Sequence, residues 1–218
     1  MNFFEGIVEM FSTGKYMLQL LEGFKMTLLI SFFAAILGLV LGTLVALAMI
    51  TTGKGFSRVL RAISKVYITI IRGTPMALQL FIMYYVIFTF RGFPPQITAI
   101  IAFGINSGAY VAENIRGGIL SVDIGQTEAG RALGLNSRIT LIKIVIPQAI
   151  KNVIPAIGNE LIALIKETSI VSMVGMFDLT MAAKIIGSGN NISVYGWESR
   201  NGYFLTIHKN SKRTLILR

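Results

Sequence analysis

"MTLLISFFAAILGLVLGTLVALAMITTG" forms residues 26–53, and none of its side chains carries a charge. A helix needs about 20 predominantly apolar residues to cross the hydrocarbon core of a bilayer, so this stretch predicts a membrane-spanning helix. The composition agrees, because 54% of the 218 residues are hydrophobic and only 14% are charged. The mean hydropathy is +0.70. We therefore expect an all-α, polytopic membrane protein.

Charge and cysteine content exclude several classes of function. The net charge is +10, but the basic residues are scattered between apolar blocks, so we expect no nucleic-acid partner. The chain has no cysteine and a single histidine, His208, which excludes disulfides and leaves no ligand set for a metal site. No cofactor is expected in this chain.

The two ends differ from the middle. Residues 1–22 contain Glu5, Glu9 and Glu22 and lack the apolar core of a secretory signal, which predicts an interfacial helix. Residues 23–187 form the predicted transmembrane domain. Residues 188–218 form a polar, basic tail with no stretch able to span a membrane.

Further spans are predicted along the transmembrane domain. The second span begins among residues 58–72 and continues through the uncharged residues 73–90. The third covers residues 92–112, and the fourth covers residues 141–165. In the first span, Gly38 and Gly42 form a small-xxx-small pair. This pair indicates either a close helix contact or a chance occurrence in a glycine-rich helix.

Loop charges predict the orientation. Lys54, Arg58, Arg61 and Lys65 occur without any acidic residue between the first two spans, which places that loop in the cytoplasm. Counting spans from there puts the N-terminus outside and residues 120–140 inside.

Residues 120–140 are too polar to span and too patterned to be a plain loop. Asp123 with Gln126 resembles a capping box, Gly134 is a natural helix stop, and Asn136 or Ser137 can cap a second helix. A helix of roughly ten residues is marginal alone in water, so it must dock on something. The surface on which it packs belongs either to a partner protein or to the chain's own membrane helices.

Within this segment, "GQTEAGRALGL" (125–135) continues to Ile144 and Pro147. The pattern resembles the "EAA" loop of importer permeases of the ATP-binding cassette family, with Gly130 in place of the usual second alanine. "YITIIRGTPMALQL" (67–80), "SGAYVAENIRGGI" (107–119) and "PQAIKNVIPAIGNELIALIKETSI" (147–170) are similar to the polar amino-acid branch of these permeases. The resemblance covers residues 23–184.

The resemblance implies a type I importer permease fold and a transport subunit that is not itself an enzyme. It implies a dimer of cytoplasmic ATPase subunits that hold ATP and Mg²⁺, an extracytoplasmic solute-binding protein, and a second permease subunit, identical or not. The implied location is the bacterial cytoplasmic membrane. The coupling loop would comprise Glu128, Ala129, Gly130, Ala132, Gly134 and Pro147. No phosphate-loop motif or catalytic triad occurs in the sequence.

Charged residues near the spans are candidates for the substrate path, because intramembrane charges are costly and usually functional. These residues are Glu113, Arg116, Glu160, Lys166 and Glu167. Carboxylates and cations of this set could receive the two charges of an amino acid, or pair with one another. Arg72, Gly73, Thr74 and Pro75 instead predict a structural helix break.

The chain departs from the family pattern after residue 187. The resemblance implies a fifth span there, whereas the sequence offers a basic tail. The tail either folds back toward the cytoplasm, or is a genuine variant, or comes from a truncated gene or shifted reading frame, and we favour the last hypothesis. An ATPase-independent carrier or channel is an alternative function, although the two halves show no inverted repeat.

Overall fold

The computed structural model describes residues 14–51 and 55–187, and these are helical, with no strand among them. The longer helices are α2 (Gly14–Ile50), α3 (Phe56–Gly73), α5 (Pro95–Leu120) and α8 (Ile146–Glu167). The shorter helices are α4 (Met76–Ile82), α6 (Ile124–Ala132), α7 (Ser137–Thr140) and α9 (Leu179–Gly187). Two π-helical segments, η1 (Met83–Ile87) and η2 (Leu141–Val145), and a 3₁₀ segment, η3 (Thr168–Val174), complete the order.

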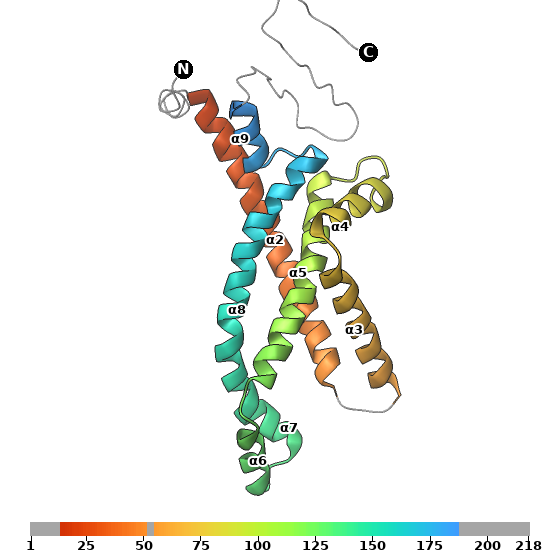
Figure 1. Cartoon of the computed structure of the whole chain (residues 1–218), viewed down its shortest axis with the longest axis vertical. Helices are drawn as coiled ribbons and strands as arrows, with labels where there is room; N and C mark the ends of the chain where they lie inside the picture. The colour runs from red at the N-terminus through yellow and green to blue at the C-terminus, as the bar shows by residue number, and fades with distance from the viewer. Residues whose placement is uncertain (1–13, 52–54, 188–218) are drawn as a thin grey trace, which may run out of the picture.

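The long helices run side by side. In Figure 1, α2 and α5 lie together, with α8 on one side and α3 on the other. The end of α2 and the start of α3 lie toward the same end as α6 and α7, whereas α4 and α9 lie toward the opposite end. Helix α2 is continuous from Gly14, so residues 14–22 of the predicted interfacial segment extend the first span without a break.

Helix length and apolar composition together identify fewer spans among the described residues than the four that we predicted from the sequence. Tyr16–Ile50 and Ser137–Val174 are long and apolar enough to cross a membrane, and the bent pair α3 and α4–η1 adds a third within the described residues. Helix α5 does not qualify, yet it lies beside α2 (Figure 1). Its burial between α2, α3 and α8 explains why it need not be strongly apolar.

The second predicted span is sharply bent. Its straight part is α3, which ends at Gly73, and α4 departs from it at 106°. Proline at position 75 lacks a backbone N–H and cannot continue the ladder of α3. The predicted break is therefore confirmed, but residues 76–87 turn aside and do not extend α3.

Helices α2 and α5 approach each other through glycines on both sides. A Cβ atom at Gly38 would lie 2.8 Å from the Cβ of Ser107, and one at Gly42 would lie 2.7 Å from the carbonyl oxygen of Gly108. On α5, a Cβ at Gly104 would lie 2.6 Å from Leu37. The small-xxx-small pair predicted on α2 is thus an intramolecular contact between parallel helices.

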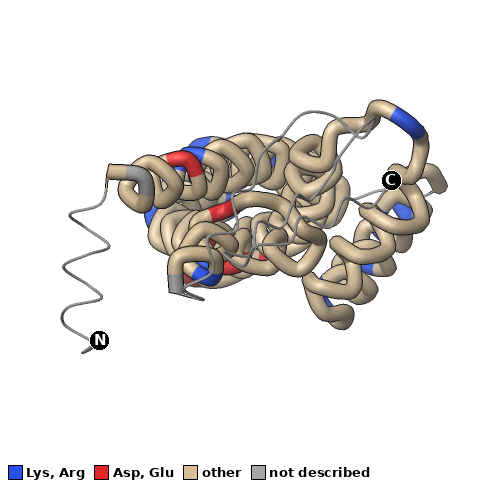
Figure 2. Tube along the Cα trace, turned by 90° about the horizontal axis from the view of Figure 1, so that it is seen from above, with Lys and Arg blue, Asp and Glu red and all other residues tan. Residues whose placement is uncertain are grey.

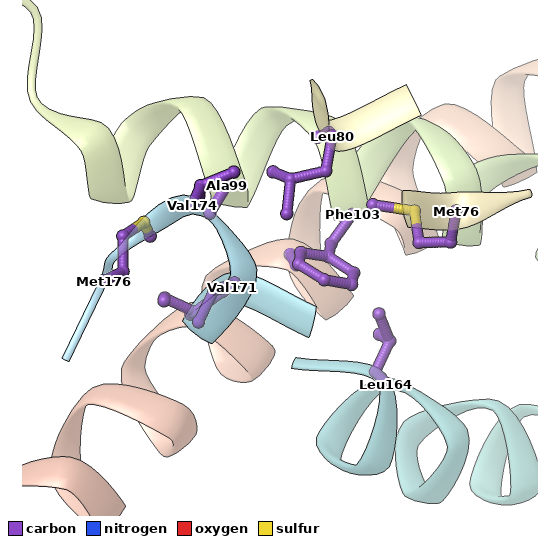
Figure 3. Packing of buried hydrophobic residues seen from close by; sticks show 11 residues of the cluster. Met76, Leu80, Ala99, Phe103, Leu164, Val171, Val174 and Met176 are labelled. Atoms are coloured by element: carbon purple, nitrogen blue, oxygen red, sulfur yellow. The ribbon is translucent and has the colours of Figure 1, made fainter. Parts of the chain in front are cut away.

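The main hydrophobic core lies toward the end that carries α4. Side chains from α4, α5, α8 and η3 point toward one another there (Figure 3). Phe103 of α5 and Leu80 of α4 are fully buried, and Leu164 of α8 is nearly so. This core fixes the bent segment α4 against α5.

Helix α9 begins where the family's fifth span was expected. The backbone N–H of Leu179 donates to the Thr27 hydroxyl of α2 at 3.3 Å. A Cβ at Gly23 would lie 2.7 Å from the carbonyl oxygen of Asp178, so α9 starts in tight contact with α2. The predicted basic tail, 188–218, lies outside the described residues.

Candidate functional site

Local capping defines the two short helices between α5 and α8. The Asp123 carboxylate accepts a bond from the backbone N–H of Gly125 at 2.6 Å and starts α6. At the end of α6, Gly134 has φ 80°, and the N–H of Leu135 bonds to the carbonyl of Gly130 at 3.1 Å. The Asn136 side chain then caps α7 through the N–H of Ile139 at 2.9 Å. The helix–turn–helix predicted from sequence is confirmed.

Gln126, the second residue of the predicted capping box, bonds to α8. The side-chain amide of Gln126 accepts a bond from Gln148 of α8 at 3.3 Å. Near the same end, Asn152 of α8 donates to the Ser121 hydroxyl at 2.8 Å. Both bonds tie the α6–α7 segment and the end of α5 to α8.

Most predicted coupling residues face outward. Glu128, Ala129, Ala132 and Gly134 are all exposed. Two large apolar side chains of the same segment are also exposed, Ile124 at 72% and Leu133 at 80%. Figure 1 shows α6 and α7 projecting beyond the ends of α2 and α3. An exposed apolar surface on a projecting helix is suited to a protein partner.

Gly130 differs from its neighbours because it is buried against α7 and η2. A Cβ there would lie 2.9 Å from both the Thr140 methyl and the Ile144 Cδ1. Thr140 has little freedom to withdraw, since it is buried and its hydroxyl donates to the Asn136 carbonyl at 3.1 Å. The glycine therefore lets α6 pack directly on α7 and η2.

Pro147 lies exposed at the start of α8, directly after η2. Proline lacks an N–H, and its ring clashes with the carbonyl four residues earlier. Widening the preceding turn relieves this clash, and the N–H of Ile146 accordingly bonds to Leu141, five residues back. A single long helix, 137–174, thus carries the predicted coupling segment at one end.

Polar side chains form hydrogen bonds to the groups left without partners at the break between α3 and α4. The Gln79 amide donates to the Ile71 carbonyl at 2.8 Å and to the Thr74 hydroxyl at 2.7 Å. Asn106 of α5, which is buried, donates to the Gln79 carbonyl oxygen at 3.1 Å. The carbonyls freed by Pro75 thus find donors, and the break is fastened to α5.

A charged cluster joins α3 to α5 just beyond this break. Arg116 binds Glu113 with two hydrogen bonds, the one from Nε being 3.0 Å long. Arg72 lies with Nη1 4.0 Å from a Glu113 oxygen and with its guanidinium carbon 5.1 Å from the centre of the Tyr110 ring. The pairing of Glu113 with Arg116, one of the two readings left open by the sequence, is present.

Helix α8 adds carboxylates to the same side. Glu160 interacts with the Ser107 hydroxyl of α5 and lies within electrostatic range of Arg72 and Glu167. Glu160 and Glu167 are half-buried and seven residues apart, close to two turns, so they share one face of α8. Lys166 is exposed on another face, so the structure does not bring it to this cluster.

Residues 38–207 match the family described as binding-protein-dependent transport system inner membrane components. The chain belongs to this family. It is 42% identical over 173 residues to the arginine transport system permease protein ArtQ of Bacillus subtilis, covering 78% of this chain and 76% of that protein. It is 36% identical over 191 residues to the glutamine transport system permease protein GlnP of Escherichia coli, covering 86% and 85%.

A solved structure confirms the fold of this permease. The structure is described as an amino acid ABC transporter with histidines, and it matches with a TM-score of 0.74 and 41% identity over 80% of both chains. The predicted type I importer permease fold is confirmed. Family membership also counts against the alternative of an ATPase-independent carrier, because the family is described as binding-protein-dependent and the matching structure as an ABC transporter.

Sequence reasoning placed some residues of the permease's charged cluster and missed others. Arg72 was assigned only to the helix break, and neither Ser107 nor Tyr110 was singled out. Their roles depend on how α3 and α8 pack on α5, which local spacing does not give. In the view from above, Lys and Arg positions are scattered over separate helices of the described chain (Figure 2). No group of His, Cys, Asp and Glu suited to a metal ion occurs among the described residues.

Proposed function

We propose that this permease subunit imports amino acids across a bacterial cytoplasmic membrane. Two permease copies, identical or sister subunits, enclose the path, and a solute-binding protein delivers the amino acid from outside. Two cytoplasmic ATPase subunits bind ATP and Mg²⁺ and drive alternating access. The identity to the arginine and glutamine permeases supports amino acids as the substrate class.

The single observation that carries this proposal is the exposed α6 surface. Glu128 and Ala129 lie there beside Ile124 and Leu133, on a helix that projects from the transmembrane bundle (Figure 1). A groove in the ATPase subunit is the proposed partner. Closure of the ATPase dimer would move α6, and the contact at Gly130 would pass that movement to α8.

The proposed substrate path lies along the charged cluster. An amino acid carries an ammonium and a carboxylate, and each needs an opposite charge once water is removed. Glu160 and Glu167 suit the ammonium, and Arg72 suits the carboxylate better than Lys166, which lies on another face. Glu113 pairs with Arg72, and Arg116 in turn binds Glu113, so these two side chains complete the polar side of the path.

The proposed orientation puts the N-terminus outside. The end with α6, α7 and the start of α3 would then face the cytoplasm, where the ATPase acts (Figure 1). The basic residues of the α2–α3 loop support this orientation.

Uptake by the reconstituted complex tests the proposal. Proteoliposomes that contain the permease, its ATPase and its solute-binding protein should accumulate a labelled amino acid only when ATP is present. Competition by a panel of unlabelled amino acids then identifies the preferred side chain. Accumulation of no amino acid in the panel would contradict the proposal.

A further inference from the structure

Helix α3 presents three different faces along its length. Ser64 and Ile68 are buried and form the face that packs inside the bundle. A second face carries Arg58, Lys65 and Arg72, which recur at every seventh residue. A third face carries exposed apolar side chains: Phe56, Val59, Ile63, Val66 and Ile70.

The seven-residue repeat makes the basic face a straight row. An α-helix has about 3.6 residues per turn and rises about 1.5 Å per residue, so neighbouring cations in the row are about 10 Å apart. Phe56, Ile63 and Ile70 follow the same repeat on the apolar face. Basic and apolar rows therefore run the whole length of α3 on different sides.

Arg72 shows which way the basic row faces. Its guanidinium lies over the Tyr110 ring of α5 and near Glu113, so this side of α3 looks toward the polar cluster. Arg58 and Lys65 are exposed on the same side. No acidic residue occurs between residues 55 and 72, and the ion pairs within the described residues involve neither cation.

Arg61 lies beside the row but is already used. Its Nη2 donates to the carbonyl of Thr51, just after the end of α2, at 2.7 Å. This bond fastens the start of α3 to the end of α2 and leaves Arg58 and Lys65 as the cations available to a ligand.

A general preference for basic residues on the cytoplasmic side does not explain this arrangement. That preference concerns depth in the membrane and is indifferent to the side of a helix. On α3, Val59 and Ile63 are 56% and 61% exposed at the same depth as Arg58 and Lys65. The two sides of one helix at one depth are therefore suited to different surroundings, an apolar one such as lipid on one side and water on the other.

We propose that Arg58 and Lys65 extend the charged cluster into a positively charged, water-filled lane along the inner half of the permease. Its ligand is the carboxylate of the transported amino acid. This carboxylate moves from Arg72 to Lys65 and then to Arg58. The inference rests on the proposed function of the charged cluster. A carboxylate midway between two cations about 10 Å apart lies about 5 Å from each, inside the distance of about 8 Å over which physiological salt screens charges.

Single cysteines test the lane, since the chain has none of its own. R58C and K65C are compared with V59C and I63C in the reconstituted complex, in vesicles whose cytoplasmic side faces outward. A membrane-impermeant thiol reagent should label the first pair about tenfold faster or more, because a thiol whose pKa is raised one unit by lipid has about tenfold less reactive thiolate. Equal labelling of the four positions would overturn the proposal.

A transport assay with matched charges complements the labelling. The variant R58Q/K65Q should lower the maximal uptake rate severalfold and leave KM unchanged, since the amino acid is first bound at Glu160 and Arg72. K151Q, which removes an exposed lysine from α8 outside the row, should transport as the unmodified complex does. An unchanged maximal rate in R58Q/K65Q would overturn the lane. If the unmodified complex takes up no amino acid, the proposed function itself fails.

Discussion

At the scale of single residues, Gly130 decides how closely α6, the proposed coupling helix, approaches α7 and η2. Its missing Cβ leaves room for Thr140 and Ile144, each of which would otherwise lie 2.9 Å from it. The resemblance to the "EAA" loop drew attention to this glycine as a departure, but sequence alone did not show what fills the space. The filling residues come from α7 and η2, beyond the turn at Gly134.

Gly130→Val should therefore separate α6 from α7. Overpacking a close contact typically costs about 1–3 kcal/mol, and the strain should lower the apparent Tm of the purified permease and its coupled uptake. Adding Thr140→Ala removes the methyl and hydroxyl that meet the new side chain. The double variant should recover part of both losses, whereas strictly additive effects would contradict direct contact between the two residues.

The carboxylate of Glu160 gives a second test at this scale. Hydrogen bonds to charged groups contribute about 1.5–3 kcal/mol, so Glu160→Gln should raise the KM for uptake by about tenfold or more. Lys166→Gln is the matched control, because Lys166 is exposed on another face of α8. Uptake kinetics measured on both variants check the prediction, and equal effects would remove Glu160 from the path.

At the scale of elements, local signals were predictable and pairings were not. The caps of α6 and α7 follow from residues a few positions apart, and the break at Pro75 follows from its missing N–H. The direction of α4 depends instead on the core that Leu80 forms with Phe103, and the position of Arg72 depends on how α3 meets α5. The spacing of Gly38 and Gly42 is compatible with a close helix contact, but it does not predict which helix makes the contact.

The α2–α5 contact can be tested by replacing glycine with alanine at two positions, one inside the contact and one outside it. Gly42→Ala places a Cβ 2.6 Å from Val111, so it should lower the apparent Tm of the permease. Gly117→Ala adds the same methyl on α5 where no atom lies within 4 Å. Because alanine is the better helix former by about 1 kcal/mol, the control should be neutral or stabilising. Equal destabilisation by both variants would contradict close packing at Gly42.

At the scale of the whole molecule, the fold places the two proposed functional regions on one continuous helix. Residues 137–174 run from the coupling segment, where α6 projects, to Glu160 and Glu167 (Figure 1). A continuous helix can carry a displacement from one end to the other, so we expect movement of α6 to open or close the proposed path. This connection between coupling segment and path is the central claim.

Glu128→Lys in the reconstituted complex tests that claim most directly. The substitution reverses an exposed charge on α6 and should leave the permease folded in the membrane. The measurement is the number of amino acids imported per ATP hydrolysed, with the amount of assembled permease checked in the same vesicles. We expect hydrolysis to continue while import per ATP falls severalfold. An unchanged ratio with normal assembly would contradict the role of α6 in coupling.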